Sequence, residues 1–550
     1  MSVNYLYTQK NTNFARCRKL QKLVSLVKLA FDKMIRIIHM KLKLAILSLL
    51  CVQASLSAFA DGTVKVNYSG ATAEVQSTDN SIIIERNGSH VTVIDTVRRE
   101  PLAVILSGSS GDGSFCLKGK NSATISLSSL QLTSKEGAAI EIKNKEMVRL
   151  VAERDTKNTL TITACNDTAS HKAAALWVKG DAEFGGNGVL NVVATGKGCK
   201  GVNVQGNITI SDLSFDVLTS GMYLDVDTTN TFGPPPGMPP FGEGGFDPNN
   251  IPEEVKKMFE EMMKNGPMQM GGGMPPFGGG EMPQMGGMPP FGGGMPPFGE
   301  GGGMPPMKQK YIGKAKGIRA QGTVTIESGN VTVNTSTPGA EGIEGKKGVI
   351  VNGGNVFVKA CDDAINSNNT IYFNGGNTTA WSTSNDAVDA NIEGGMPFFP
   401  MGQNQNKETS PGIVITGGVV NAFSQVGPPE EGLDCDFAPI LVSGGTAFSI
   451  GASMGPMTSV PTEETAQQPT ILFNGVNFEE GTPVILETES GKEIFKTKAP
   501  FSFKGSSTIV TSPELKKGYT YVLKSNGESY TIKIEKNFNT FNAQTPTRRF

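Results

Sequence analysis

A short strand-and-turn unit recurs along this chain, and its spacing constrains the fold more than any other feature. Between residues 326 and 446 an apolar segment ends five times in a turn of small residues. The five copies are Ile326-Glu-Ser-Gly-Asn, Val351-Asn-Gly-Gly-Asn, Phe373-Asn-Gly-Gly-Asn, Ile415-Thr-Gly-Gly-Val and Val442-Ser-Gly-Gly-Thr. A second landmark is a small residue followed by an apolar one, and its apolar members are Ile318, Ile343, Ile365, Val388 and Leu433. The first three intervals between these apolar residues are 25, 22 and 23 residues, so one structural unit repeats.

Each period holds three short strand-like pieces, and alternation within them places Val324 and Ile326 on one face and Thr325 on the other. The pieces are too short for helices. We therefore predict an all-β chain folded as a right-handed parallel β-helix, with three-stranded coils stacked about 4.8 Å apart. The apolar landmark residues would form one inward column, which less regular copies extend upstream to Ile140, Leu176, Val202 and Met222. An antiparallel sandwich also has short strands and glycine turns, and it is the alternative.

The N-terminal region predicts export. Residues 1–60 comprise an extension and, at about 40–60, a basic start, an apolar run and the small-x-small pattern of Ala58 and Ala60. Cleavage is expected between Ala60 and Asp61, which would make the protein secreted or bound to the cell surface. No transmembrane segment is expected in the mature chain, because no other apolar run is long enough.

Composition divides the remainder into five segments. The β-helix is expected in two parts, 61–228 and 312–457. Between them, residues 229–311 form a Met/Pro/Phe/Gly-rich insertion with repeated Met-Pro-Pro-Phe-Gly, whose composition predicts disorder apart from one amphipathic helix. A linker at 458–466 precedes a small antiparallel β module at 467–540. The formal net charge of −2 argues against nucleic acid as a partner.

Charged residues flank the small-apolar landmark on successive coils. The positions before it hold Lys200, Lys316, Glu341, Asp363, Asp386 and Glu431, and those after it hold Asn203, Arg319, Glu344, Asn366, Asp389 and Asp434. Stacked carboxylates repel one another, and a calcium ion with oxygen ligands at about 2.3–2.6 Å would bridge adjacent coils. The predicted calcium ligands are Asp362, Asp363, Asn366, Asp386, Asp389, Glu431 and Asp434. The alternative is that these acids only satisfy backbone groups in turns.

The pattern acid-acid-[Gly/Ala]-[Ile/Val]-x-x-[Asn/Asp], joined to Ile/Val-x-Gly-Gly strands, resembles a bacterial family of carbohydrate-binding domain-containing proteins. Ala175-Leu-Trp-Val-Lys-Gly and Ser512-Pro-Glu-Leu-Lys-Lys-Gly-Tyr-Thr-Tyr add to the resemblance. It implies a secreted parallel β-helix, similar to pectate lyases, that binds acidic and cellulosic plant polysaccharides with calcium. It also implies calcium positions at Asp362, Asp363, Asp386 and Asp389. The family often has acids where Lys200 and Lys316 stand, so the resemblance does not extend metal binding to those coils.

Three functions are consistent with these features. The favoured one is calcium-dependent binding of a uronate-containing or cellulosic polysaccharide without catalysis, with Lys316, Arg319 and Trp381 as carbohydrate contacts. The second is a calcium-dependent lyase with a Lys or Arg base, although Lys316 is more simply explained as an ion-pair partner of acids on the next coil. The third is a structural surface adhesin that attaches through its Met-Pro-Pro-Phe-Gly repeats.

Overall fold

The computed structural model describes residues 62–96, 100–164, 173–221, 315–392, 410–435 and 438–543. Contacts divide the chain into two units, residues 1–223 with 311–550 and residues 224–310, and every described residue belongs to the first unit. The predicted signal peptide, Met222 and the predicted insertion lie outside the described residues. No helix among the described residues is long and apolar enough to cross a bilayer.

Eleven strands form the first of three strand ladders, here called ladder 1. Apart from an antiparallel hairpin of its first two strands, its pairing is parallel throughout. Its strands are β3 (Ile83–Asn87), β4 (His90–Asp95), β6 (Ser114–Gly119), β8 (Ile140–Ile142), β11 (Ala174–Val178), β14 (Lys200–Val204), β17 (Lys316–Ala320), β20 (Glu341–Gly345), β23 (Ile365–Ser367), β26 (Val388–Ala390) and β29 (Leu433–Asp434).

Ladder 2 consists of short parallel strands that follow those of ladder 1 along the chain. In four of them a polar residue lies between two buried apolar ones, as in Val324-Thr-Ile. Its strands are β9 (Val148–Ala152), β12 (Ala182–Gly185), β15 (Ile208–Ile210), β18 (Val324–Ile326), β21 (Val349–Val351), β24 (Ile371–Phe373), β27 (Ile413–Ile415) and β30 (Ile440–Val442).

Ladder 3 contains the longer strands, whose alternate side chains are buried. Its strands are β1 (Thr63–Ser69), β5 (Leu102–Ser110), β7 (Ala123–Ser134), β10 (Lys157–Ile162), β13 (Val189–Ala194), β16 (Ser214–Thr219), β19 (Asn330–Thr335), β22 (Asn355–Ala360), β25 (Asn377–Ser382), β28 (Val419–Ser424) and β31 (Thr446–Ile450). Ladders 2 and 3 belong to one sheet, because β7 pairs with β9 through residues 123–127 and with β10 through residues 131–134. β2 (Thr72–Ser77) adds to β1 in antiparallel orientation.

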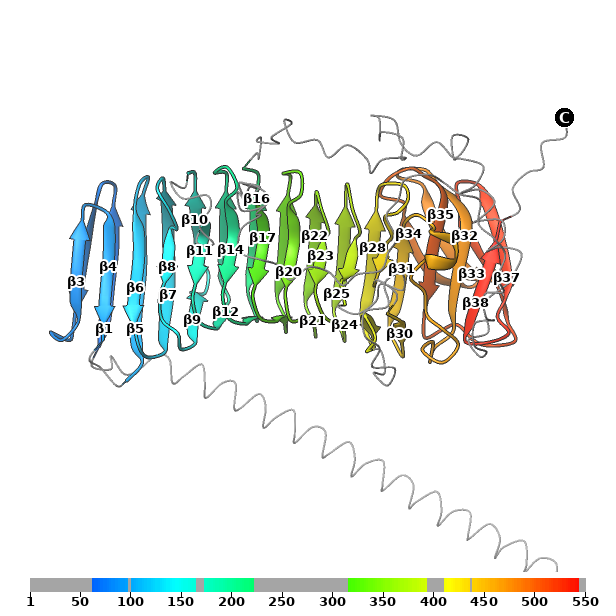
Figure 1. Ribbon diagram of the computed structural model, residues 1–550, viewed down its shortest axis with the longest axis horizontal. Coiled ribbons are helices and arrows are strands. Elements are labelled where there is room, and N and C mark those ends of the chain that lie inside the picture. The colour runs from blue at the N-terminus through cyan, green and yellow to red at the C-terminus, as the bar shows by residue number, and fades with distance from the viewer. Residues whose placement is uncertain are drawn as a thin grey trace, which may run out of the picture. The chain divides into compact units, whose positions relative to one another are not determined.

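The inward column predicted from the repeat is confirmed. Ile318, Ile343, Ile365, Val388 and Leu433 are paired in succession along ladder 1, and each is at most 2% exposed. Upstream, Ile140, Leu176 and Val202 continue the same register. Figure 1 shows the strands following one another from β3 in blue to β30 in yellow. The all-β class is therefore confirmed, and the long parallel ladders are those that a β-helix requires, whereas the sandwich alternative requires antiparallel pairing.

The small residue of the landmark is required by close packing between ladders 1 and 3. A Cβ atom on Gly342 would lie 2.2 Å from Cγ1 of Val358 and 2.4 Å from the carbonyl oxygen of Ala364. In the next two coils, Ala380 and Ala422 of ladder 3 lie at the position equivalent to Val358. The landmark position equivalent to Gly342 is occupied by Ala364 and then by Ala387. A larger side chain on one ladder is thus matched by a smaller one on the other.

The C-terminal strands continue from ladder 3. β35 (Phe503–Thr511) pairs antiparallel with β31 and with β32 (Thr470–Phe478), while β38 (Phe538–Asn542) joins β32 in parallel. A separate antiparallel sheet has the order β34 (Glu493–Lys498), β33 (Pro483–Thr488), β36 (Thr520–Ser525) and β37 (Glu528–Lys533). The region predicted as an antiparallel module therefore also contains one parallel pair. A second hydrophobic core, which includes Phe448, Phe473 and Tyr521, packs these strands against β31.

Candidate functional site

Two polar columns run along ladder 1 beside its inward column. Column 2 contains Asn203, Arg319, Glu344, Asn366, Asp389 and Asp434, which pair in succession from β14 to β29. In column 1, Lys316 pairs with Glu341. Further along column 1, the carbonyls of Asp363, Asp386 and Glu431 accept backbone hydrogen bonds from the coil before each of them. Residues distant in the sequence are therefore stacked in the order that the repeat predicts.

The first part of these columns, here called the paired half, contains acids and bases that neutralise each other. Lys316 contacts both Glu341 and Glu344, with Nζ 3.2 Å from Oε1 of Glu344. Arg319 places Nε 2.9 Å from Oε2 of Glu344, and Lys346 contacts the other oxygen. Burial alone would raise the pKa of Glu344, but the surrounding cations hold it below its ordinary value. The expected pairing of Lys316 with acids on the next coil is thus present.

Lys200 lies at the start of the paired half and is 5% exposed. Burial, with Arg319 and Lys316 nearby, lowers the pKa of Lys200 to about 8. Glu344 opposes this shift only in part. Lys200 is therefore a buried amine that loses its proton much more readily than an ordinary lysine does.

The second part, here called the acidic half, is held together largely by amides. Asn366 donates from Nδ2 to Asp363 at 2.8 Å and to Asp389 at 2.9 Å, so one amide joins carboxylates of two coils. Asn385 donates to the other oxygen of Asp363 at 2.6 Å. Asn391 donates to Asp389. These contacts orient the carboxylates but bring no positive charge.

The same arrangement continues toward β29. The backbone N–H of Glu431 donates to Asp386. The loop at Ser459 closes over the end of the columns, because its backbone N–H donates to Glu431 at 2.8 Å and its hydroxyl donates to Asp434 at 2.7 Å.

Burial raises the pKa values of several carboxyl groups in the acidic half, as it also does at Glu341 in the paired half. Burial, followed by repulsion from Asp362, raises the pKa of Asp363 to about 7. Burial raises the pKa of Asp386 to about 10, and Asp434 and Glu430 add to the effect. Burial also raises the pKa of Glu431 to about 8. A carboxyl group that resists ionisation in this way is stabilised by any cation placed beside it.

The donor chemistry suits a hard cation, although the protein ligands are few at any one point. Carboxylate and amide oxygens are the groups that calcium prefers. Within the described part of the chain, however, no three Asp, Glu, His or Cys side chains come close enough together to hold a metal ion. The acids approach one another in pairs, as Asp363 and Asp389 do around Asn366. An ion here would have only part of its ligand shell from the protein.

The remaining predicted residues are placed differently. Asp362 is half-buried beside Asp363, and its carbonyl accepts the Ser382 hydroxyl at 2.7 Å. Trp381 lies on β25 of ladder 3, so it is not part of the columns that contain Lys316 and Arg319. Its Nε1 donates to Gln425 at 3.2 Å, and Lys359 lies over its ring at 3.6 Å.

Column 2 also extends upstream through residues that the sequence analysis did not assign to it. Cys116, Glu141 and Trp177 precede Asn203 in register. Burial, followed by the charge of Glu141, raises the pKa of Cys116 to about 11, which makes this thiol a poor nucleophile. The signal was available, because Glu141 and Trp177 each follow a small-apolar landmark directly.

Residues 87–222 and 309–387 match the family model described as carbohydrate-binding domain-containing protein. The match confirms the resemblance inferred from the sequence motifs. It is interrupted between residues 222 and 309 and ends before Asp389, Glu431 and Asp434.

A solved structure, the gadolinium derivative of the polysaccharide lyase-like protein from C. thermocellum, shares 13% sequence identity and a TM-score of 0.32, and the alignment covers 73% of this chain and 100% of that one. A similarity at this level carries no argument about the site. No curated protein matches the chain.

Proposed function

We propose that this protein is a secreted, calcium-dependent polysaccharide-binding protein that does not cleave its ligand. The scaffold would be a right-handed β-helix of three-stranded coils, interrupted by the insertion at 229–311. The observation that carries the proposal is the amide-linked acidic half, in which the pKa values of Asp363 and Asp386 are raised. The match to a family named for carbohydrate binding gives the class of ligand.

Calcium would be held at more than one point along the acidic half, by a pair of carboxylates from neighbouring coils at each point, with Asp363, Asp386 and Asp389 as the principal ligands. Calcium takes six to eight oxygen ligands, and the paired protein carboxylates provide only some of them. The remaining positions suit uronate oxygens of an acidic glycan, which would make binding depend on both partners. In the paired half, Lys316 and Arg319 already form ion pairs with Glu344. These two side chains would therefore position the paired half of the site, while the calcium ion contacts the glycan at the acidic half.

Retention on immobilised polygalacturonate tests the proposal. The parent protein should be retained in calcium and released by a chelator, and Asp363→Asn with Asp386→Asn should abolish the retention. Asp181→Asn with Asp212→Asn is the matched control, because it makes the same two substitutions at exposed positions. Retention that survives the chelator, or that the acidic-half variant keeps in full, would contradict calcium-mediated binding.

Lysine-catalysed elimination is the second candidate, and Lys200 is the observation that favours it. A base would take the C5 proton of a uronate while the C4–O bond breaks, leaving a C4–C5 double bond that absorbs near-ultraviolet light. Lys200, with a pKa of about 8, is better suited to this role than a fully protonated lysine. We expect no rise in absorbance on polygalacturonate, because Lys200 is buried. A steady rise that disappears in Lys200→Met would establish the lyase instead.

A further inference from the structure

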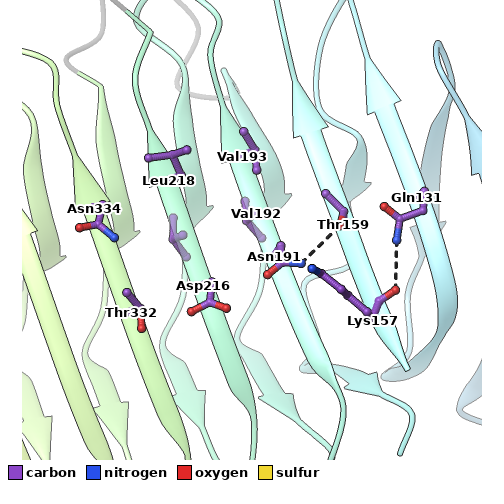
Figure 2. A pocket seen from close by; sticks show the side chains of 11 residues that line it. Gln131, Lys157, Thr159, Asn191, Val192, Val193, Asp216, Leu218, Thr332 and Asn334 are labelled. Atoms are coloured by element: carbon purple, nitrogen blue, oxygen red, sulfur yellow. Dashed lines mark hydrogen bonds between the residues drawn. The ribbon is translucent and has the colours of Figure 1, made fainter. Parts of the chain in front are cut away.

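A groove of about 640 Å³ crosses the outward face of ladder 3, away from the polar columns of ladder 1. Figure 2 shows its side chains arranged in rows across neighbouring strands of the ladder. One row is formed by residues that pair in succession from β7 to β19, namely Gln131, Thr159, Asn191, Asp216 and Thr332. Every strand thus places one hydrogen-bonding side chain at the same height.

A parallel row beside it is more apolar. Val193, Leu218 and Asn334 pair in succession, and Leu218 is 42% exposed. Both rows continue past the groove onto aromatic side chains. Thr332 pairs with Phe357, which is 38% exposed, and two strands beyond Asn334 the second row reaches Trp381 through Lys359.

The charge of the groove distinguishes it from the acidic half. Among its lining residues only Lys157 and Asp216 carry charge, and their charges are opposite. Amides and hydroxyls dominate the first row, and amides and apolar groups the second. Such a surface provides hydrogen bonds for hydroxyl groups and contact area for the C–H faces of sugar rings, but no net field for an ionic ligand.

We propose that this groove binds a neutral, linear polysaccharide, laid across the strands, without calcium. The strands repeat about every 4.8 Å, so a chain of repeating sugar units meets a repeating set of side chains. All the groove residues, together with Phe357 and Trp381, lie inside the segments that match the carbohydrate-binding family. The inference rests on the proposed function for the class of ligand but on a different surface. The predicted carbohydrate contact Trp381 lies in the same register, but Lys359 covers its ring and the ring packs on Phe501, so Trp381 is not part of the proposed groove.

Affinity electrophoresis in gels containing hydroxyethyl cellulose, with chelator present, tests this proposal. The parent protein should be retarded, and Asn191→Ala with Asn334→Ala should weaken binding at least tenfold. Thr209→Ala with Thr325→Ala is the matched control, because these outward side chains lie on ladder 2, and it should bind as the parent does. Leu218→Ala is a second groove variant that removes only exposed apolar surface, and it should weaken binding as well.

The outcome separates the two surfaces. Asp363→Asn with Asp386→Asn should leave retardation in the neutral gel unchanged even if it abolishes retention on polygalacturonate. Loss of calcium-dependent retention alone would therefore leave the groove proposal standing. The proposal is overturned if the parent is not retarded by hydroxyethyl cellulose, xylan or mannan, or if both groove variants are retarded as strongly as the parent.

Discussion

Replacing Glu344 by glutamine tests whether the ion pairs of the paired half stabilise ladder 1. Glu344 is 1% exposed and contacts Lys316, Arg319 and Lys346. Glutamine has nearly the same shape but no charge, so buried cations would lose their shared partner. Removing one member of a buried ion pair costs about 3–5 kcal/mol. Lys346 is the most exposed of the three cations and can turn toward water, so we expect a loss of about 3 kcal/mol.

Urea denaturation followed by circular dichroism at pH 7 measures this loss as a change in the free energy of unfolding. Glu327→Gln is the matched control. Glu327 is exposed, and its carboxylate accepts hydrogen bonds from the neutral amide of Asn352. That substitution should change the free energy of unfolding by less than about 0.5 kcal/mol. Adding Lys316→Met to Glu344→Gln removes one of the stranded charges, so the double variant should lose less than the sum of the two single changes.

The difference between parent and Glu344→Gln should also depend on pH. The folded pKa of Glu344 lies below its ordinary value of 4.5, so its contribution is complete above that value and is lost as the pH falls through the folded pKa. The stability gap should therefore close in acid. A gap below about 1 kcal/mol at pH 7, or strict additivity with Lys316→Met, would refute the view that the network is held by charge.

Three further predictions concern single positions. Gly342→Ala should cost about 1–3 kcal/mol by overpacking against Val358, and Val358→Ala should recover part of this loss in thermal unfolding, since Ala364 and Ala380 form such a pair one coil later. Lys200→Met should stabilise the protein at pH 7 by about 3 kcal/mol, because folding lowers the pKa of Lys200 from 10.5 to about 8. The free energy of unfolding of the parent should therefore rise between pH 8 and pH 10.5, and the variant should lack that rise. Calcium at a hundred times its Kd should stabilise the parent by about 2.7 kcal/mol, seen as a higher Tm, and an equal shift in Asp363→Asn with Asp386→Asn would place the ion elsewhere.

The register of the ladders could be predicted from the sequence because three separate sequence signals recur in every period. A small residue, an apolar residue and a glycine turn recur together, so an error in one is corrected by the others. This is why Ile318, Ile343 and Ile365 were correctly aligned without any knowledge of the structure. The period breaks between Ile140 and its partner Leu176, which are 36 residues apart, and the sequence pattern did not assign Glu141 to column 2.

The chemistry of the columns was less predictable than their alignment. Residue types placed acids at equivalent positions, but they did not show that Asn366 would lie between Asp363 and Asp389. That contact depends on side-chain conformation, which no repeat pattern specifies. The sequence did not predict the groove on ladder 3, because the groove depends on the register between strands such as β13 and β16. The sequence of a single strand shows only that polar and apolar residues alternate.

The boundary between the paired and acidic halves follows from side-chain identity, since the strands of ladder 1 pair in one register on both sides of it. On one side, Glu344 is buried with cations from its own and neighbouring coils. One coil later, Asp363 is buried with the amides of Asn366 and Asn385, which donate hydrogen bonds but carry no charge. Burial raises the pKa of Asp363 and of Glu341, its counterpart in column 1. At Glu344 the surrounding cations outweigh burial, and the pKa is lowered. This difference between Glu344 and Asp363 supports the proposal that a cation from outside the protein binds at the acidic half.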